Sequence, residues 1–131
     1  MLNFVICDDN PNALSKLSHM FESVFVKHDL QAKVVFKTTD EFDLLSFVRN
    51  NQVDAIVLDI NLKSSLTGLD IATKLRKEHN NSYIIFTTAH SEFVFLAYKC
   101  KTFDFLCKPV TIERLEETVL RLFEDVKNNS S

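Results

Sequence analysis

Four short motifs hold the side chains of this sequence that are best suited to chemistry. They are Asp8-Asp9, Asp59, Thr87-Thr88 and Lys108-Pro109, and each follows a short apolar run. Three carboxylates within roughly 5 Å of one another would repel by about 3 kcal/mol per pair at an effective dielectric constant of about 20. A hard divalent cation with oxygen ligands, such as Mg²⁺, compensates that repulsion. The motifs therefore predict a metal-assisted acidic site wherever the fold brings them together.

Lys108 and Thr88 would complete such a site. A lysine supplies a compact second positive charge that can pair with a carboxylate or with a phosphoryl oxygen, and Thr88 offers one short, neutral hydroxyl donor. A metal, a lysine and a hydroxyl around a carboxylate are the groups that assist in-line phosphoryl transfer onto aspartate. Asp59 is the predicted nucleophile because it alone ends the run that we expect to form the central strand.

Five runs are apolar nearly throughout, which is typical of strands buried on both faces of a parallel sheet. They span residues 4–7, 34–36, 55–58, 83–86 and 103–107. Parallel strands need crossovers that cover both faces of the sheet. We therefore expect an α/β fold with a flavodoxin-like, doubly wound five-stranded parallel sheet of order 2-1-3-4-5 and helices on both faces. In such a fold the carboxyl ends of the strands meet at one rim, where the four motifs lie.

The segments between these runs have helical spacing. Asn10 and Pro11 predict the cap and first residue of one helix, Gly68 precedes another, and Thr111 caps the last. The apolar stripes that predict these helices are Leu14, Leu17, Phe21 and Val24; Phe42, Leu45 and Val48; Ile71, Ala72 and Leu75; and Ile112, Leu115, Val119, Leu122 and Val126. Strands and helices therefore alternate along the whole chain.

The motifs at the ends of the first, third, fourth and fifth runs resemble the receiver domain of two-component response regulators. The matching positions are Asp8-Asp9, Asp59, Thr88-Ala89 and Lys108-Pro109. The resemblance covers essentially the whole chain. It implies that Asp59 is the phosphoacceptor, that Asp9 and Asp59 bind Mg²⁺ directly, and that Asp8 acts through water.

The same resemblance implies roles for four further groups. The main-chain carbonyl of Asn61, two residues after Asp59, corresponds to the third protein ligand of Mg²⁺. Thr88 corresponds to the switch hydroxyl that moves toward the phosphoryl group, and Lys108 to its charge partner. Phe105 corresponds to the switch aromatic, where Tyr is commoner in the family.

The loop after Asp59 is similar to that of the accessory-gene-regulator (AgrA), LytTR-type subgroup. Lys63 stands where many receivers have Pro, and Gly68 follows Asp59 by nine positions rather than eight, across the Ser-rich residues 63–67. Residues 87–92 also resemble that subgroup, whose regulators carry a LytTR DNA-binding domain after the receiver.

This resemblance implies a phosphorylation switch in the bacterial cytoplasm. Asp59 would take a phosphoryl group from a sensor histidine kinase and later lose it by hydrolysis, so the chain would catalyse only its own modification. The output would be transcription regulation through a LytTR-type domain that this chain does not contain. We expect the receiver domain at residues 1–126 and a polar tail or the start of a linker at 127–131.

A strongly apolar stretch at residues 93–98 suggests an output surface. Phe93, Phe95 and Tyr98 would be exposed there and would support homodimerisation when phosphorylation moves Thr88 and Phe105. A thickly packed core element is the alternative interpretation of these residues.

Other functions remain as alternatives. The chain could be a stand-alone receiver or a phosphorylation-independent docking module. An Asp-nucleophile phosphohydrolase would need an acid two positions after the nucleophile, where Asn61 cannot serve. A flavin-type electron carrier shares the fold, but no Ser/Thr/Gly phosphate-binding loop follows the first run.

Charge and composition exclude further classes. Fifteen Lys and Arg against eighteen Asp and Glu give a formal charge of −3, so there is no broad basic surface for nucleic acid. No apolar run is long enough for membrane insertion or export. We expect Cys7, Cys100 and Cys107 to be reduced thiols and His90 to be an ordinary loop histidine.

Overall fold

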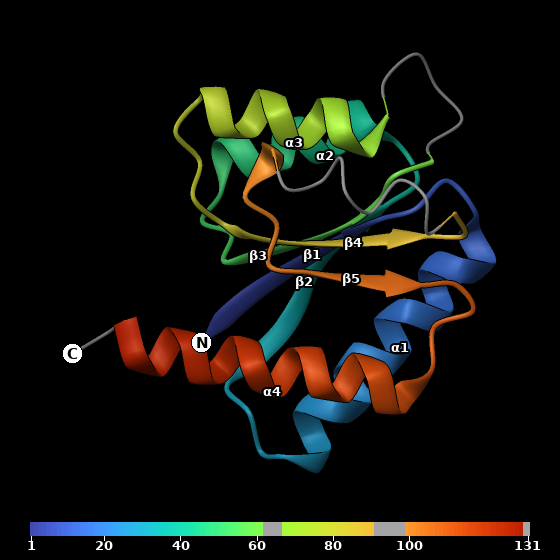
Figure 1. Cartoon of the computed structure of the whole chain (residues 1–131), viewed down its shortest axis with the longest axis vertical. Coiled ribbons are helices and arrows are strands. Elements are labelled where there is room, and N and C mark those ends of the chain that lie inside the picture. The colour runs from blue at the N-terminus through green and yellow to red at the C-terminus, as the bar shows by residue number, and fades with distance from the viewer. Residues whose placement is uncertain (62–66, 91–98, 130–131) are drawn as a thin grey trace.

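A five-stranded parallel sheet forms the centre of the protein in the computed structural model, which describes residues 1–61, 67–90 and 99–129 (Figure 1). The strands lie in the order β2-β1-β3-β4-β5, and all four pairings are parallel. Their bounds are β1 Leu2–Cys7, β2 Ala32–Thr38, β3 Ala55–Asp59, β4 Tyr83–Thr88 and β5 Asp104–Cys107. The predicted strand order is confirmed.

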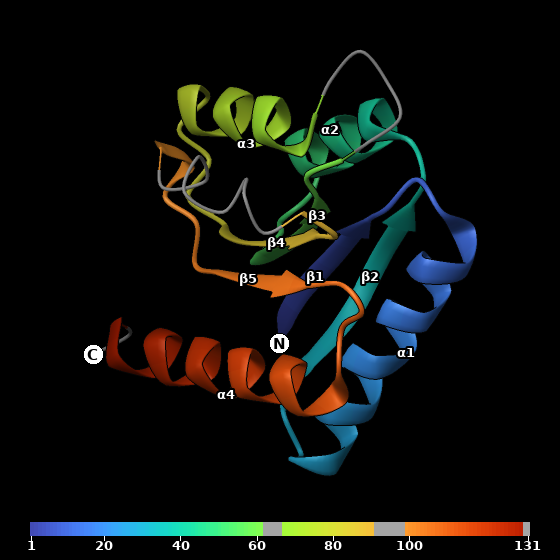
Figure 2. The ribbon, with the colours of Figure 1, turned by 45° about the vertical axis from the view of Figure 1, so that its right-hand side comes forward.

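Helices cover both faces of the sheet. Helices α1 (Pro11–Lys27) and α4 (Ile112–Asn129) lie on one face, and α2 (Glu41–Asn50) and α3 (Gly68–Lys77) lie on the other (Figures 1 and 2). The flavodoxin-like, doubly wound α/β fold is therefore confirmed. The predicted output surface, with Phe93, Phe95 and Tyr98, lies outside the described residues.

Two apolar clusters form the core, one on each side of the sheet. Alternate residues of β1 divide between them: Phe4 and Ile6 pack toward α1 and α4, and Val5 and Cys7 pack toward α2 and α3. Val57 of β3 and Ile85 of β4 belong to the same side as Phe4. Both faces of the strands are thus buried, which explains why the runs are continuously apolar.

The helix starts follow the predicted capping chemistry. The side chain of Asn10 accepts hydrogen bonds from the main-chain N–H groups of Asn12 and Ala13, at 2.9 and 3.1 Å, directly before Pro11. Thr111 likewise accepts a hydrogen bond from the N–H of Arg114 at 3.3 Å. These caps fix where α1 and α4 leave the rim of the sheet.

The predicted apolar stripe of α2 is wrong at Phe42, which is 58% exposed. Asp40 caps this helix, and its buried apolar residues are Leu44, Leu45 and Val48. Because Phe42 is two positions before Leu44, it lies on a different side of the helix from the buried stripe. Ile112, the first residue of α4, is also partly exposed, at 39%.

Helix α4 continues to Asn129, three residues beyond the predicted end of the receiver domain at 126. The first three residues of the predicted polar tail are therefore helical. In the described part of the chain, none of the helices has the length and apolar character that a membrane span requires.

Candidate functional site

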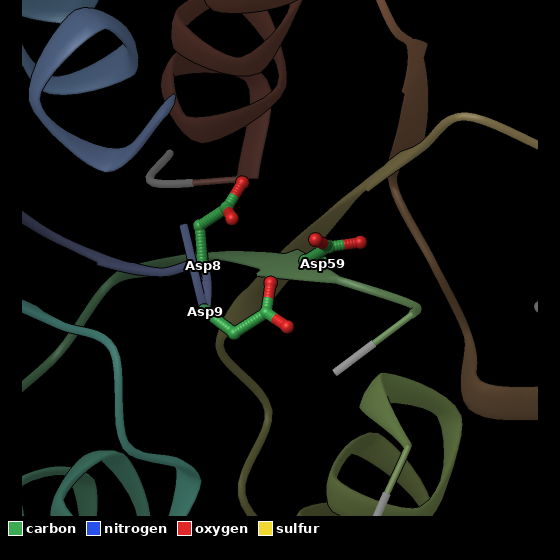
Figure 3. Close-up of side chains that lie close together, drawn as sticks. All are labelled: Asp8, Asp9 and Asp59. Atoms are coloured by element: carbon green, nitrogen blue, oxygen red, sulfur yellow. The ribbon is translucent and has the colours of Figure 1, made fainter. Parts of the chain in front are cut away.

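Three carboxylates gather at the carboxyl ends of β1 and β3. Cys7 of β1 is paired with Leu58 of β3, so the next residues, Asp8 and Asp59, are neighbours across the sheet. Oxygen atoms of Asp8, Asp9 and Asp59 all lie within 4.8 Å of one another (Figure 3). Asp8 and Asp59 are buried, at 0% and 4% exposure. An all-oxygen set of this kind fits a hard divalent cation such as Mg²⁺.

Lys108 follows the edge strand β5 and reaches this cluster along the rim, past the end of β4. Its Nζ lies 2.8 Å from Asp8 Oδ2 and 3.1 Å from Asp59 Oδ2. The main-chain N–H of Lys108 donates to the carbonyl of Thr88 at 2.7 Å, which anchors the residue beside β4. These two contacts bring one positive charge to Asp8 and Asp59, and a bound cation would offset further repulsion among the three carboxyl groups.

Local turns hold one oxygen of each buried carboxylate. Asp8 Oδ1 accepts a hydrogen bond from the N–H of Asn10 at 2.9 Å, and Asp59 Oδ1 accepts one from the N–H of Asn61 at 3.0 Å. This bond to the backbone two residues onward is the Asx-turn geometry that aspartate favours. Each Oδ2 is turned to Lys108, so the carboxylates are oriented from both sides.

Gly68 packs directly against the main chain of Asp59. A Cβ atom on Gly68 would lie 2.2 Å from the Asp59 carbonyl oxygen and 2.9 Å from the Cα of Ile60. The N–H of Gly68 also donates to the carbonyl of Ile60 at 2.9 Å. Because the obstructing atoms are backbone, any larger residue would have to displace Asp59 or α3.

Burial and the ion pairs shift the site's pKa values in definite directions. Burial raises the pKa of Asp59, although hydrogen bonds from Asn61 and Lys108 oppose this shift. Burial alone would lower the pKa of Lys108, but its bonds to Asp8 and Asp59 outweigh that effect and raise its pKa. Lys108 therefore remains a cation at neutral pH.

The cysteines agree with the prediction of reduced thiols. All three are free, with Cys7 and Cys100 buried and Cys107 exposed. Burial raises the pKa of Cys7 to about 12, and the nearby carboxylates of Glu41 and Asp8 add to the shift. Cys7 is thus a protonated core residue beneath the acidic cluster.

Thr88 is fully buried at the end of β4. Its Oγ1 accepts the N–H of His90 at 2.9 Å and lies 3.2 Å from the His90 carbonyl, to which it can donate. It also accepts from the side-chain amide of Asn61 at 3.3 Å. The residue predicted as the switch hydroxyl is thus linked through Asn61 to the loop after Asp59.

The remaining predicted site residues have clear positions. Phe105 lies on β5 and is partly buried. It packs against the apolar core cluster on the α2–α3 side of the sheet. His90 lies in the loop after β4 and does not belong to the described acidic cluster. The sequence pointed to the carbonyl of Asn61, but not to its side-chain bond with Thr88; an amide two positions after Asp59 was the available signal.

Comparisons with known proteins agree with this geometry. The family model for the response regulator receiver domain matches residues 4–120. The sensory transduction protein LytR of Staphylococcus saprophyticus is 32% identical over 117 residues, covering 88% of this chain and 43% of that protein. The transcriptional regulatory protein BtsR of Escherichia coli is 30% identical over 125 residues, covering 95% and 49%. The chain thus spans about half the length of these curated relatives.

A solved structure shows the same fold. The response regulatory domain of protein mrkE from Klebsiella pneumoniae has a TM-score of 0.85 and 28% identity, and the match covers 97% of this chain and 99% of that one.

A second LytR, from Staphylococcus haemolyticus, is 28% identical over 126 residues, or 96% of this chain and 47% of that protein. The LytR relatives support the predicted LytTR-type subgroup. The chain belongs to the response regulator receiver domain family.

Proposed function

We propose that this chain is a phosphorylation switch in which Asp59 takes a phosphoryl group from the phosphohistidine of a sensor histidine kinase. An oxygen of the Asp59 carboxylate attacks the phosphorus atom and forms a P–O bond. The P–N bond breaks, and its electron pair goes to the imidazole nitrogen. Attack by water later releases inorganic phosphate and regenerates the carboxylate.

The acidic cluster supports Mg²⁺ as the cofactor of this transfer. Its ligands would be the carboxylates of Asp9 and Asp59 and the carbonyl of Asn61, with Asp8 acting through water. When bound, the ion supplies positive charge that offsets the repulsion between the carboxylates and the phosphoryl oxygens. The 4.8 Å grouping of the three carboxylates and their all-oxygen chemistry support this assignment.

The chain's own residues supply the remaining functions. Lys108, which contacts Asp8 and Asp59, would pair with an oxygen of the incoming phosphoryl group. The hydroxyl of Thr88 would exchange its bonds to His90 and Asn61 for one to that group. Phe105, on the neighbouring strand, would move with it and change the surface near β5.

We further propose that the switch controls transcription through a second, DNA-binding half of LytTR type. This rests on the half-length matches to LytR and to BtsR, a transcriptional regulatory protein. The receiver domain would occupy residues 1–126, with 127–131 starting the connection, in a cytoplasmic regulator that dimerises on phosphorylation. A stand-alone receiver is the alternative for the output.

The contact of Lys108 with Asp8 and Asp59, beside a third carboxylate, carries the proposal. The test is intact mass spectrometry after incubation with acetyl phosphate and Mg²⁺. The wild-type chain should gain one phosphoryl group, and the Asp59→Asn variant should gain none. Label on Asp59→Asn would identify a different acceptor. A wild-type chain without label would favour the docking module instead.

A further inference from the structure

Thr87 has a buried hydroxyl group that makes no hydrogen bond. The residue is 0% exposed, and its Oγ1 is the one buried side-chain nitrogen or oxygen atom without a partner among the described residues. A buried hydroxyl that has given up its water contacts without gaining a protein partner destabilises the fold. Such a group calls for an explanation, and a role in another state of the protein is one.

The position of Thr87 connects it to the acidic cluster. Thr87 is paired with Asp59 of β3 on one side and with Leu106 of β5 on the other. Paired residues of a parallel sheet point to the same face. Two residues earlier, Ile85 packs with Leu106 in the core cluster on the α1–α4 side. The side chains of Asp59 and Thr87 are therefore neighbours on that face.

Lys108 must extend across the end of β4 to reach its partners. It follows β5, whereas Asp59 ends β3 and Asp8 follows β1, and β4 lies between β5 and β3. Thr87 lies near the end of β4, on the face shared with Asp59. An ammonium group has three N–H donors, and Asp8 and Asp59 accept only two hydrogen bonds from it.

We propose that Thr87 is a positioning residue whose hydroxyl accepts a hydrogen bond from Lys108 when Asp59 is phosphorylated; this inference rests on the proposed function. In the unmodified protein, the negative charges of Asp8 and Asp59 draw the ammonium group toward β1 and β3. Phosphorylation replaces the Asp59 oxygen that Lys108 now contacts with an oxygen of the phosphoryl group, so the ammonium group shifts from its present position and its third N–H reaches the Thr87 hydroxyl. The hydroxyl therefore stabilises the phosphorylated form over the unmodified one.

The hydroxyl groups of Thr87 and Thr88 have different surroundings and different proposed roles. The hydroxyl of Thr88 already has bonding partners in His90 and Asn61. Successive residues of a strand point to opposite faces, so the two hydroxyls serve opposite sides of the sheet. Thr88 would contact the phosphoryl group itself, whereas Thr87 would act through Lys108.

The test compares Thr87→Val, which keeps the shape but removes the hydroxyl, with Thr87→Ser, which keeps the hydroxyl. Thermal unfolding is measured without metal or phosphate mimic. Binding of beryllofluoride with Mg²⁺, which mimics an acyl phosphate, is measured by isothermal titration. Thr87→Val should melt no lower than the wild type but bind beryllofluoride about tenfold more weakly, the effect of losing one hydrogen bond to a charged group. Thr87→Ser should bind within about twofold of the wild type.

Thr118→Val is the matched control. Thr118 is equally buried, at 0% exposure, but its hydroxyl donates to Asp104 at 2.6 Å and accepts from Arg114 at 2.7 Å. This variant should lower the melting temperature and leave beryllofluoride affinity unchanged. A threonine with a purely structural role would behave like Thr118. Thr87→Val should instead keep the melting temperature and lose beryllofluoride affinity.

Two results would overturn the inference. A lower melting temperature for unmodified Thr87→Val would show that its hydroxyl already has a partner, such as a buried water. Beryllofluoride binding equal to that of the wild type would show that the phosphorylated form does not use it. A wild-type chain that neither binds beryllofluoride nor gains a phosphoryl group would contradict the proposed function itself, and the role of Thr87 with it.

Discussion

Two regions of this molecule pair buried carboxylates with cations in opposite ratios. At the rim, Lys108 contacts both Asp8 and Asp59, and Asp9 lies beside them. Between β5 and α4, the single carboxylate of Asp104 accepts hydrogen bonds at 2.8–3.2 Å from two arginines and also bonds to Thr118. At the rim one lysine thus contacts two carboxylates, whereas at Asp104 two arginines contact one.

The pKa directions follow this balance. Burial raises the pKa of Asp59, and its hydrogen bonds do not overcome that effect. Burial also acts to raise the pKa of Asp104, but the bonds from Arg114 and Thr118 outweigh it and the net pKa is lowered. Asp104 is therefore a completed structural contact that ties α4 to β5. At the rim, one lysine is shared between two buried carboxylates and the pKa of Asp59 stays raised, an arrangement suited to a cation and a phosphoryl group.

The largest effect should come from removing the cation of the rim. Lys108→Met leaves two buried carboxylates without their counter-ion, and we expect it to reduce the free energy of unfolding by about 3 kcal/mol. This is at the low end for breaking a buried pair, because the Lys108 side chain is 26% exposed. Urea unfolding without Mg²⁺ measures this loss, and added Mg²⁺ should restore part of it. A variant as stable as the wild type would show that Asp8 and Asp59 do not depend on Lys108 for charge compensation.

Adding Mg²⁺ should stabilise the folded protein through the carboxylates of the rim and not through Asp104. At a Mg²⁺ concentration 100 times the dissociation constant, binding to the folded state alone adds about 2.7 kcal/mol to the free energy of unfolding. Asp9→Asn should lose most of this gain, whereas Asp104→Asn should keep it. Thermal unfolding over a Mg²⁺ series measures the difference. Equal gains in the two variants would place the cation elsewhere.

Asp104→Asn should destabilise the protein by about 1–3 kcal/mol at neutral pH, because its bonds are charge-assisted. The loss should depend on pH. Since the folded-state pKa of Asp104 lies below its ordinary value of 3.8, its contribution is complete above that value and disappears as pH falls through the folded pKa. Urea unfolding of wild type and variant between neutral pH and pH of about 2 should therefore converge at the acid end. A constant difference would contradict the lowered pKa.

The smallest effect should come from Arg121→Met. Its side chain is 51% exposed beside Asp104, and its guanidinium lies 5.1 Å from the ring centre of Phe103. Because Arg114 remains bound to the same carboxylate, we expect a loss of less than about 1 kcal/mol, as for most exposed ion pairs. Chemical denaturation measures it. A loss as large as that of Lys108→Met would remove the contrast between the two regions.

Much of the fold could be predicted from local patterns. The five strands were found because they are apolar on both faces, although β2 extends beyond the expected run to include Lys33 and Thr38. Lys33 and Thr38 pair with β1 through their main chains, which the polar character of their side chains did not indicate. Phe42 was assigned to the core because it stands three positions before Leu45, but the burial of Leu44, two positions after Phe42, turns the buried stripe away from it.

The Asp104 contacts could not be predicted in the same way. Arg114 and Arg121 occur at helical spacing among acidic residues, which is typical of a solvated helix face. Only the packing of α4 against β5 turns them toward a buried carboxylate. The same holds for Gly68, whose contact with the Asp59 carbonyl depends on the path of the loop after β3.

The sequence by itself determined the strand order and the family, because apolar runs and strand-end motifs are local signals that a parallel sheet gathers at one rim. Tertiary structure alone decided which side chains contact one another there. Lys108 extends past the end of β4 to bind Asp8 and Asp59, and the hydroxyl of Thr87 is left without a hydrogen-bond partner. Hydrogen bonds and electrostatic forces between side chains depend on distances of a few ångströms and on exclusion of water. Those quantities exist only once distant segments have packed together.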